Sequence, residues 1–247
     1  MHRFANPTRF LRIVDLIRPW AIVLTVALLG AGLVWGLVFA PPDYQQGDTV
    51  RIMYIHVPAA WMAMFVYGVI AVASAVGLIW KHPVADLSAK ASAPIGAAFA
   101  LITLVSGSLW GQPMWGTWWV WDARLTSMLL LFFLYVGYIA LWQAYDDPGR
   151  AARAAAILAL VGSVNLPVIK FSVDWWNTLH QPASVMTLSG PKIHPTILVP
   201  LILMILGFNA YYVTVWCYRV KAEVLGRKVR ILRLGRAEAA ASVAATP

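Results

Sequence analysis

The sequence predicts an all-α integral membrane protein with six transmembrane helices. Of its 247 residues, 61% are hydrophobic and only 12% are charged, whereas soluble domains carry about 25% charged residues. Six apolar runs are each long enough to cross a hydrocarbon core of ~30 Å as a helix. We therefore expect a single membrane domain over residues 1–218 and a basic tail over residues 219–247, whose Ala-rich end should be disordered.

The first predicted span, about Trp20–Phe39, is too long for the apolar core of a typical signal peptide. The cleavage-like triplet Val38-Phe39-Ala40 therefore does not change the assignment. Residues 1–18 are basic and have apolar residues at helical spacing, which predicts a short amphipathic helix on the membrane surface.

Prolines and polar loops bound the later spans. Pro58 suits the first turn of the second span, where a missing N–H needs no partner. Asn165 and Pro167 predict a kink in the fifth span, with buried neighbours bonding the freed carbonyl. These five spans cover about 57–80, 91–109, 125–145, 151–171 and 195–218.

The lysines and arginines are distributed unevenly. The N-terminus, the second and fourth loops and the tail hold 15 of the 19. Positive loops remain in the cytoplasm, so both termini should be cytoplasmic and the first, third and fifth loops periplasmic. The net charge of +9 is then mainly a topology signal, with help from anionic membrane lipid, and does not indicate nucleic acid.

A tryptophan-rich run at residues 110–126 reads W-G-Q-P-M-W-G-T-W-W-V-W-D-A-R-L-T. Indole rings build a rigid apolar platform that suits a flat hydrophobic macrocycle such as a porphyrin. If the second half of the run is helical, Trp115, Trp118, Trp119 and Asp122 share one face. The alternative is an aromatic belt at the membrane interface, but a belt needs scattered indoles. The proposed platform consists of Trp110, Trp115, Trp118, Trp119 and Trp121.

Three of the five histidines, His56, His180 and His194, fall on the predicted periplasmic side. His56 and His180 each have a proline two residues later, which restricts the backbone. Two imidazoles on opposite faces of a porphyrin would saturate its iron, which favours holding heme over oxygen chemistry. Each could equally be a hydrogen-bonded loop residue. No recognised motif covers His194, so we leave it out.

Charged residues close the tryptophan-rich run. Arg124 suits bidentate pairing with a heme propionate, with Arg51 and Lys192 as further candidates, while Asp122 is expected to orient its loop through backbone N–H groups. The alternative is that Asp122 and Arg124 only stabilise the loop. The single Cys217 excludes a CxxCH attachment site, so the heme would be held without thioether bonds, as heme b.

The run resembles the WWD signature of a heme-handling superfamily, and specifically the heme exporter protein C family of bacterial cytochrome c maturation. M-Y-I-H-V-P-A-A-W at residues 53–61 and W-W-N-T-L-H-Q-P at residues 175–182 resemble two further family segments. The tryptophans of the second segment either widen the platform or seat their loop in the interface. The resemblance implies that His56 and His180 are axial ligands of heme iron, and that the protein lies in the bacterial inner membrane.

The resemblance also implies partners. Family members present heme to a small periplasmic heme chaperone, which captures it covalently through a histidine. They work with the subunits of an ATP-binding cassette (ABC) transporter and with a small single-span membrane protein. This chain has no conventional catalytic constellation and no Walker motif, so any promotion of heme attachment would come from positioning.

Two other functions remain open. A transporter that moves heme through the bundle predicts polar residues within the spans, where only Asn165 and Asn209 stand out. A structural subunit that docks a transporter would not explain the tryptophan-rich run. Synthetases that attach heme share the signature but are usually larger than this chain.

Overall fold

The computed structural model describes residues 6–176, 178–180, 190 and 193–244, with side chains to residue 237. Six helical segments in this part of the chain are long and apolar enough to cross a membrane. The predicted all-α polytopic fold is confirmed. The helices are α1 (Pro7–Val34), α2 (Met53–Trp80), α3 (Pro83–Trp115), α4 (Ala123–Ala144), α5 (Pro148–Gly162), α6 (Asn165–Trp175) and α7 (Pro195–Ala244).

Several helices begin where the local sequence provides a cap. α1, α3 and α5 each start at a proline, whose missing N–H costs nothing at the first helical position. The residue before each proline accepts a backbone N–H of the first turn through its side chain. These capping residues are Asn6, His82 and Asp147.

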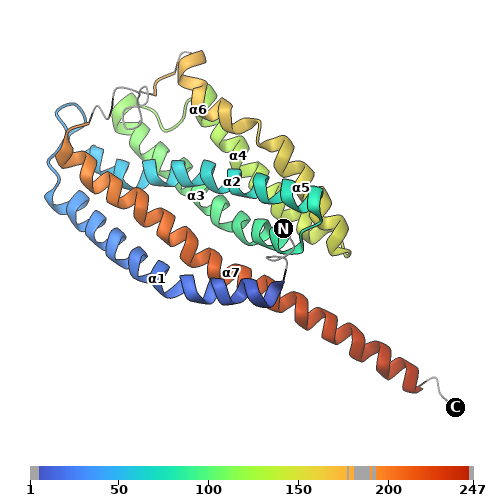
Figure 1. Ribbon diagram of the computed structural model, residues 1–247. Coiled ribbons are helices and arrows are strands. Elements are labelled where there is room, and N and C mark those ends of the chain that lie inside the picture. The colour runs from blue at the N-terminus through green and yellow to red at the C-terminus, as the bar shows by residue number, and fades with distance from the viewer. Residues whose placement is uncertain (1–5, 177, 181–189, 191–192, 245–247) are drawn as a thin grey trace.

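The helices form a bundle whose centre is the α2–α3 pair (Figure 1). α7 packs against α2 and α3 and carries α1 along its outer side, while α4, α5 and α6 cover the other side. Buried aromatic residues pack the centre of the bundle. The Tyr67 and Tyr135 rings meet edge to face at 5.1 Å, and the Tyr135 hydroxyl donates to the Ala63 carbonyl at 2.7 Å. This close packing fixes the positions of α2, α3 and α4 relative to one another.

Both ends of the chain differ from expectation. α1 starts at Pro7 and runs without a break to Val34, followed by a π-helical turn over Trp35–Phe39, so the described residues contain no separate surface helix. α7 continues as helix through residue 218 to Ala244, where we expected a disordered end. The alanines, leucines and arginines of this segment are strong helix formers, which accounts for the difference.

The second span begins earlier than its hydropathy suggests. A 3-10 turn over Asp48–Ile52 leads directly into α2 at Met53. His56 and Pro58 therefore lie inside the helix, rather than before it and in its first turn. This position restricts the direction of the His56 side chain, because χ1 near +60° would drive it into the preceding turn of α2.

The fifth span is interrupted where a kink was expected, and the Ser163 carbonyl, four residues before Pro167, accepts from the Leu166 N–H of the same span at 3.1 Å. Helix α5 ends at Gly162 and α6 starts at Asn165. The buried Asn165 side chain donates through Nδ2 to the Ser127 carbonyl of α4 at 2.8 Å. This bond fixes α6 beside α4. The start of α4 lies in the tryptophan-rich run, and the end of α6 lies a few residues before His180 in the sequence.

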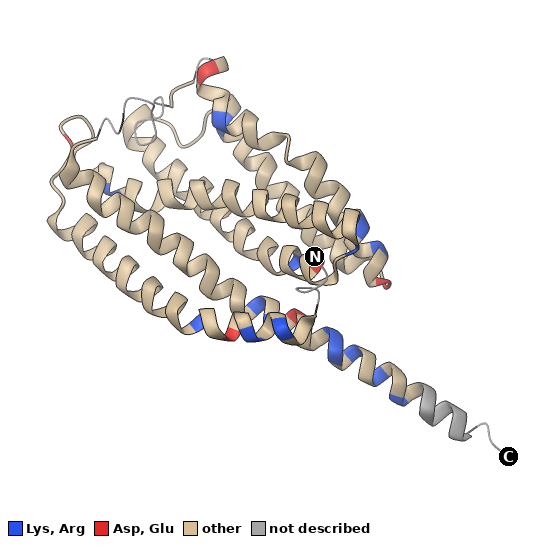
Figure 2. Ribbon diagram, viewed as in Figure 1, with Lys and Arg blue, Asp and Glu red and all other residues tan. Residues whose placement is uncertain are grey.

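Lysine and arginine gather at the end of the bundle where both termini lie (Figure 2). Ion pairs there join Lys90 to Glu223 and Lys221 to Asp15, both at 2.7 Å. The basic residues whose uneven distribution along the sequence indicated cytoplasmic termini therefore also lie at one end of the folded bundle (Figure 2).

This asymmetry gives a prediction about topology. Reporters fused after His82, Arg150 and Arg219 should be active in the cytoplasm, because the positive-inside rule retains these segments. Reporters after Gly47, Gly116 and Gly190 should be active in the periplasm. Paired alkaline phosphatase and fluorescent protein fusions measure this, and a periplasmic signal at Arg150 would break the six-span arrangement.

Candidate functional site

The tryptophan-rich run lies at the end of the bundle away from the two termini (Figure 1). The run is helical only at its two ends: α3 ends at Trp115, and α4 begins at Ala123. Gly116 closes α3 with φ 74°, a left-handed conformation that glycine adopts at little cost. The chain is then non-helical until Asp122, which precedes α4. The conditional helical face shared by Trp115, Trp118, Trp119 and Asp122 is therefore wrong.

Asp122 is a buried residue that joins three parts of this end. Its Oδ1 accepts the Leu125 N–H at 2.7 Å and so caps α4, in agreement with the loop-orienting role that we expected. Its Oδ2 accepts from the Thr178 hydroxyl and from His180 Nδ1, the latter at 3.0 Å. The carboxylate thus ties the segment after α6 to the start of α4.

The charge states of this network follow from its contacts. Burial acts to raise the pKa of the Asp122 carboxyl, but the hydrogen bonds from Leu125, Thr178 and His180 outweigh it and the pKa is lowered. Burial lowers the pKa of the His180 imidazole, against the opposing effect of Asp122. At neutral pH the carboxylate is therefore ionised and the imidazole neutral. Because a carboxylate only accepts, the His180 proton lies on Nδ1.

His56 is held in a similar way from α2 to α3. Its Nδ1 lies 3.0 Å from Ser106 Oγ, and Ser106 donates its own hydrogen to the Ile102 carbonyl at 2.6 Å. Ser106 therefore accepts from His56 Nδ1–H. A Cβ at Gly107 would lie 3.0 Å from His56 Cε1, so the absence of a side chain there lets the ring lie against α3.

The two imidazoles belong to one site. In the described part of the chain both make their side-chain hydrogen bonds through Nδ1, so Nε2 is the atom left to bind a metal. The tryptophans that contact them, Trp110 for His56 and Trp115 for His180, both lie near the end of α3. The structure thus places His56 of α2 and His180 of the segment after α6 beside the end of α3, with Arg124 two residues after the Asp122 that holds His180.

The five tryptophans divide into two groups. Trp110 meets the His56 ring edge to face at 5.5 Å, and Trp115 meets the His180 ring at 4.8 Å. The loop tryptophans are more open: Trp118 is 59% exposed and Trp121 is 74% exposed, with Trp119 half-buried against Trp121 at 5.4 Å. One group positions imidazoles, and the other offers apolar surface.

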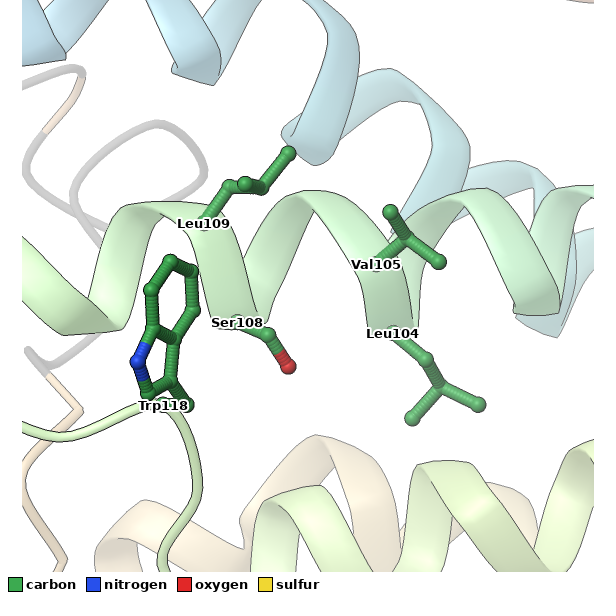
Figure 3. A pocket seen from close by; sticks show the side chains of 5 residues that line it. All are labelled: Leu104, Val105, Ser108, Leu109 and Trp118. Carbon is green, nitrogen blue, oxygen red and sulfur yellow. The ribbon is translucent and has the colours of Figure 1, made fainter.

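Trp118 also closes one end of a shallow groove on α3. The groove has a volume of about 360 Å³ and is lined by Leu104, Val105, Ser108, Leu109 and Trp118. Figure 3 shows the Trp118 indole reaching from its loop to the side of α3, next to Ser108 and Leu109. The loop therefore packs on the helix that carries Ser106 and Trp110.

Other predicted residues are placed apart from this network or outside it. Arg51 pairs with Asp48 at 3.3 Å, and Lys192 lies outside the described residues. His194 contacts Thr196 through Nδ1 at 2.9 Å and remains exposed at the start of α7. Trp175 and Trp176 contact each other and, through Trp175, Phe171, so their role in the platform stays a prediction.

Sequence reasoning missed the residues that hold the histidines and tryptophans. Ser106 is an ordinary small residue of an apolar helix, although it stands one turn before Trp110. Gln46 accepts from Trp110 Nε1 at 2.9 Å across 64 residues of sequence, which no local pattern indicates. Thr178 stands two residues before His180, and this adjacency was the available signal.

This fold and this site define a polytopic helical membrane protein with a two-histidine, tryptophan-lined site at one end of its bundle. The family model described as heme exporter protein C matches residues 1–234. Curated relatives of that name are similar throughout: the chain is 57% identical to the Bradyrhizobium diazoefficiens protein over 94% of this chain and 88% of the relative. It is 51% identical to the Escherichia coli K12 protein over 91% of each, and 44% identical to that of Paracoccus denitrificans over 93% and 95%. The chain belongs to the heme exporter protein C family.

Proposed function

We propose that the chain binds heme b at the periplasmic end of its bundle and presents it to a periplasmic heme chaperone during c-type cytochrome biogenesis. The relatives' name supports heme as the cargo. The observation that carries the proposal is the pair His56 and His180, each held through Nδ1 beside a tryptophan ring. Such a pair suits a metal whose other ligands come from a macrocycle.

The contacts around each imidazole fit iron ligation. Metal-binding histidines usually donate their second ring N–H to a carboxylate, a carbonyl or another polar group, which fixes the tautomer and the ring orientation. Asp122 provides this for His180 and Ser106 provides it for His56. The exposed faces of Trp118 and Trp121 supply apolar surface for the porphyrin.

Arg124 is the proposed partner of a heme propionate. Its Nε is buried and has no hydrogen-bond partner among the described residues, a property that it shares with Arg51 Nε; Arg124 differs in lying two residues after Asp122, which contacts His180. A buried unpaired donor is costly, so a bound carboxylate would remove that cost. The loop-stabilising alternative for Asp122 accounts for its cap, but not for this free Arg124 donor.

The proposed mechanism is one of positioning. Heme brings the iron and the reactive vinyl groups, and the chaperone brings the histidine that forms the covalent bond. The chain's part would be to hold the iron through the His56 and His180 imidazoles and to position the macrocycle on the tryptophans for the partner. Fixing two reactants in a suitable geometry lowers the barrier without a catalytic group.

We further propose an inner-membrane location with both termini cytoplasmic, in a complex with ABC transporter subunits and a small single-span protein. The basic residues at the terminal end of the bundle (Figure 2) support this orientation. The transport alternative rested on Asn165 and Asn209. Both use their amides for hydrogen bonds to carbonyls of the chain itself, Ser127 and Ile205, each at 2.8 Å, which does not favour a polar path through the bundle.

The test is heme transfer from the full-length protein in lipid nanodiscs. The protein is loaded with hemin and mixed with the purified periplasmic heme chaperone, and covalently bound heme is measured on denaturing gels by heme stain. The wild type should transfer heme, and Arg124→Gln should retain less heme than Lys170→Gln, which removes an exposed cation on α6. Transfer at the same rate from hemin in empty nanodiscs would contradict presentation by this chain.

A further inference from the structure

The two histidines have different hydrogen-bond partners. His180 Nδ1 donates to a carboxylate, Asp122, whose side chain is 5% exposed. The partners of His56 are neutral: Nδ1 donates to the Ser106 hydroxyl oxygen, and the ring also interacts with the backbone of Thr103. This difference is not needed to hold two rings in place, because either acceptor fixes a tautomer.

The Asp122 carboxylate is firmly placed. One oxygen is fixed by the Leu125 N–H at the start of α4 and the other by the Thr178 hydroxyl. Thr178 also accepts the backbone N–H of His180 at 3.1 Å. Although His180 lies in a connection between helices, its ring is therefore tied to a helix start through a charged acceptor.

The Ser106 hydroxyl is a weaker acceptor. Its hydrogen is used within α3, toward Ile102, and its oxygen carries no net charge. Hydrogen bonds to an ionised acceptor are roughly twice as strong as neutral ones, and a carboxylate behind an imidazole raises the basicity of the metal-binding nitrogen. The two Nε2 atoms should therefore differ as electron donors.

We propose that His180 is the stronger, retained ligand and that His56 is the weaker, exchangeable one. This inference rests on the proposed function, since it assigns unequal roles to the two ligands of the same site. A site built this way keeps its cargo attached on one face while the other face opens. Asp122 and Ser106 act as positioning residues that set this inequality.

The first test compares His56→Gly with His180→Gly in the full-length protein, purified in nanodiscs and loaded with hemin. The His56→Gly protein should retain at least ~10-fold more heme per protein than the His180→Gly protein. Loss of an outer hydrogen bond to a metal ligand already lowers metal affinity by about this factor. It should be five-coordinate and become low-spin again on adding imidazole. Equal retention, or more heme in His180→Gly, would overturn the inference.

The second test changes the acceptors. Asp122→Asn keeps an oxygen for the Leu125 N–H, since asparagine is an equally good helix cap, but removes the charge behind His180. It should weaken hemin binding about tenfold or more and raise the reduction potential of the bound heme, because a nearby negative charge favours the ferric state. Ser106→Ala should change both quantities less.

Asp48→Asn is the matched control, because Asp48 is an exposed acid that pairs with Arg51 and has no hydrogen bond to either histidine among the described residues. Its potential should equal that of the wild type. If Asp122→Asn leaves the potential at the control value, the inference is wrong. If neither histidine variant alters the heme spectrum, the proposed function itself fails; if both histidines ligate but retain heme equally, only the inequality fails.

Discussion

Glycine in place of His180 should abolish the six-coordinate low-spin spectrum of the hemin-loaded protein. The imidazole is held by Asp122 and Thr178 with Nε2 as its remaining donor atom, so its removal takes away an iron ligand and leaves the carboxylate without its partner. Because loss of an outer contact alone lowers metal affinity by about 10–100-fold, loss of the ligand should exceed that range. Absorption spectra and heme-to-protein ratios measure the effect.

His56→Gly should also remove the low-spin spectrum, through loss of the ligand on α2. The control is His194→Gly, because His194 is exposed and contacts only Thr196 among the described residues through its ring. Its spectrum should equal that of the wild type. A low-spin spectrum that survives in both His56→Gly and His180→Gly but is lost in His194→Gly would show that the ligands are assigned wrongly.

Alanine in place of both Trp118 and Trp121 should weaken heme retention at least tenfold. Each aromatic pair contributes about 0.5–1.5 kcal/mol beyond simple burial, and 1.4 kcal/mol corresponds to a factor of ten. These two indoles are the exposed members of the run, so their removal should cost little in folding. Half-buried Trp119 is a poorer choice, since its loss would also disturb the loop.

The matched control for this pair is Trp20→Ala, because Trp20 is 68% exposed but lies on α1, outside the tryptophan-rich run. The heme-to-protein ratio, normalised to the folded fraction from size-exclusion chromatography, separates the two interpretations. A platform predicts a fall only in the double variant. An aromatic belt predicts lower membrane yield in both proteins, with an unchanged ratio of heme to folded protein.

The spans were predictable because hydropathy and length decide them almost alone. Their ends were less so: the polar turn at residues 48–52 continues into α2, and the basic start of α1 continues into its span. Hydropathy cannot detect such continuity, because the hydrogen bonds of a helix do not depend on the polarity of its side chains.

The histidines and tryptophans of the site were chosen from sequence, since dense indoles and proline-flanked histidines are visible locally. Ser106, Thr178 and Gln46 were not, because their contacts reach His56, Asp122 and Trp110 through the tertiary fold. The division of the tryptophans also required the structure. Gly116 ends α3 in the middle of the run. The sequence spacing did not predict this helix end, and so could not predict which indoles contact the histidines and which remain exposed.

We propose that His56 and His180 together hold heme iron. Low-temperature electron paramagnetic resonance of the ferric, hemin-loaded full-length protein can show this, since the spectrum distinguishes six-coordinate low-spin from five-coordinate high-spin iron. We predict the low-spin signal of two neutral imidazoles in the wild type and its complete loss in the His56→Gly, His180→Gly double variant. A high-spin signal in the wild type, or a low-spin signal that persists in the double variant, would show that these two histidines are not the iron ligands.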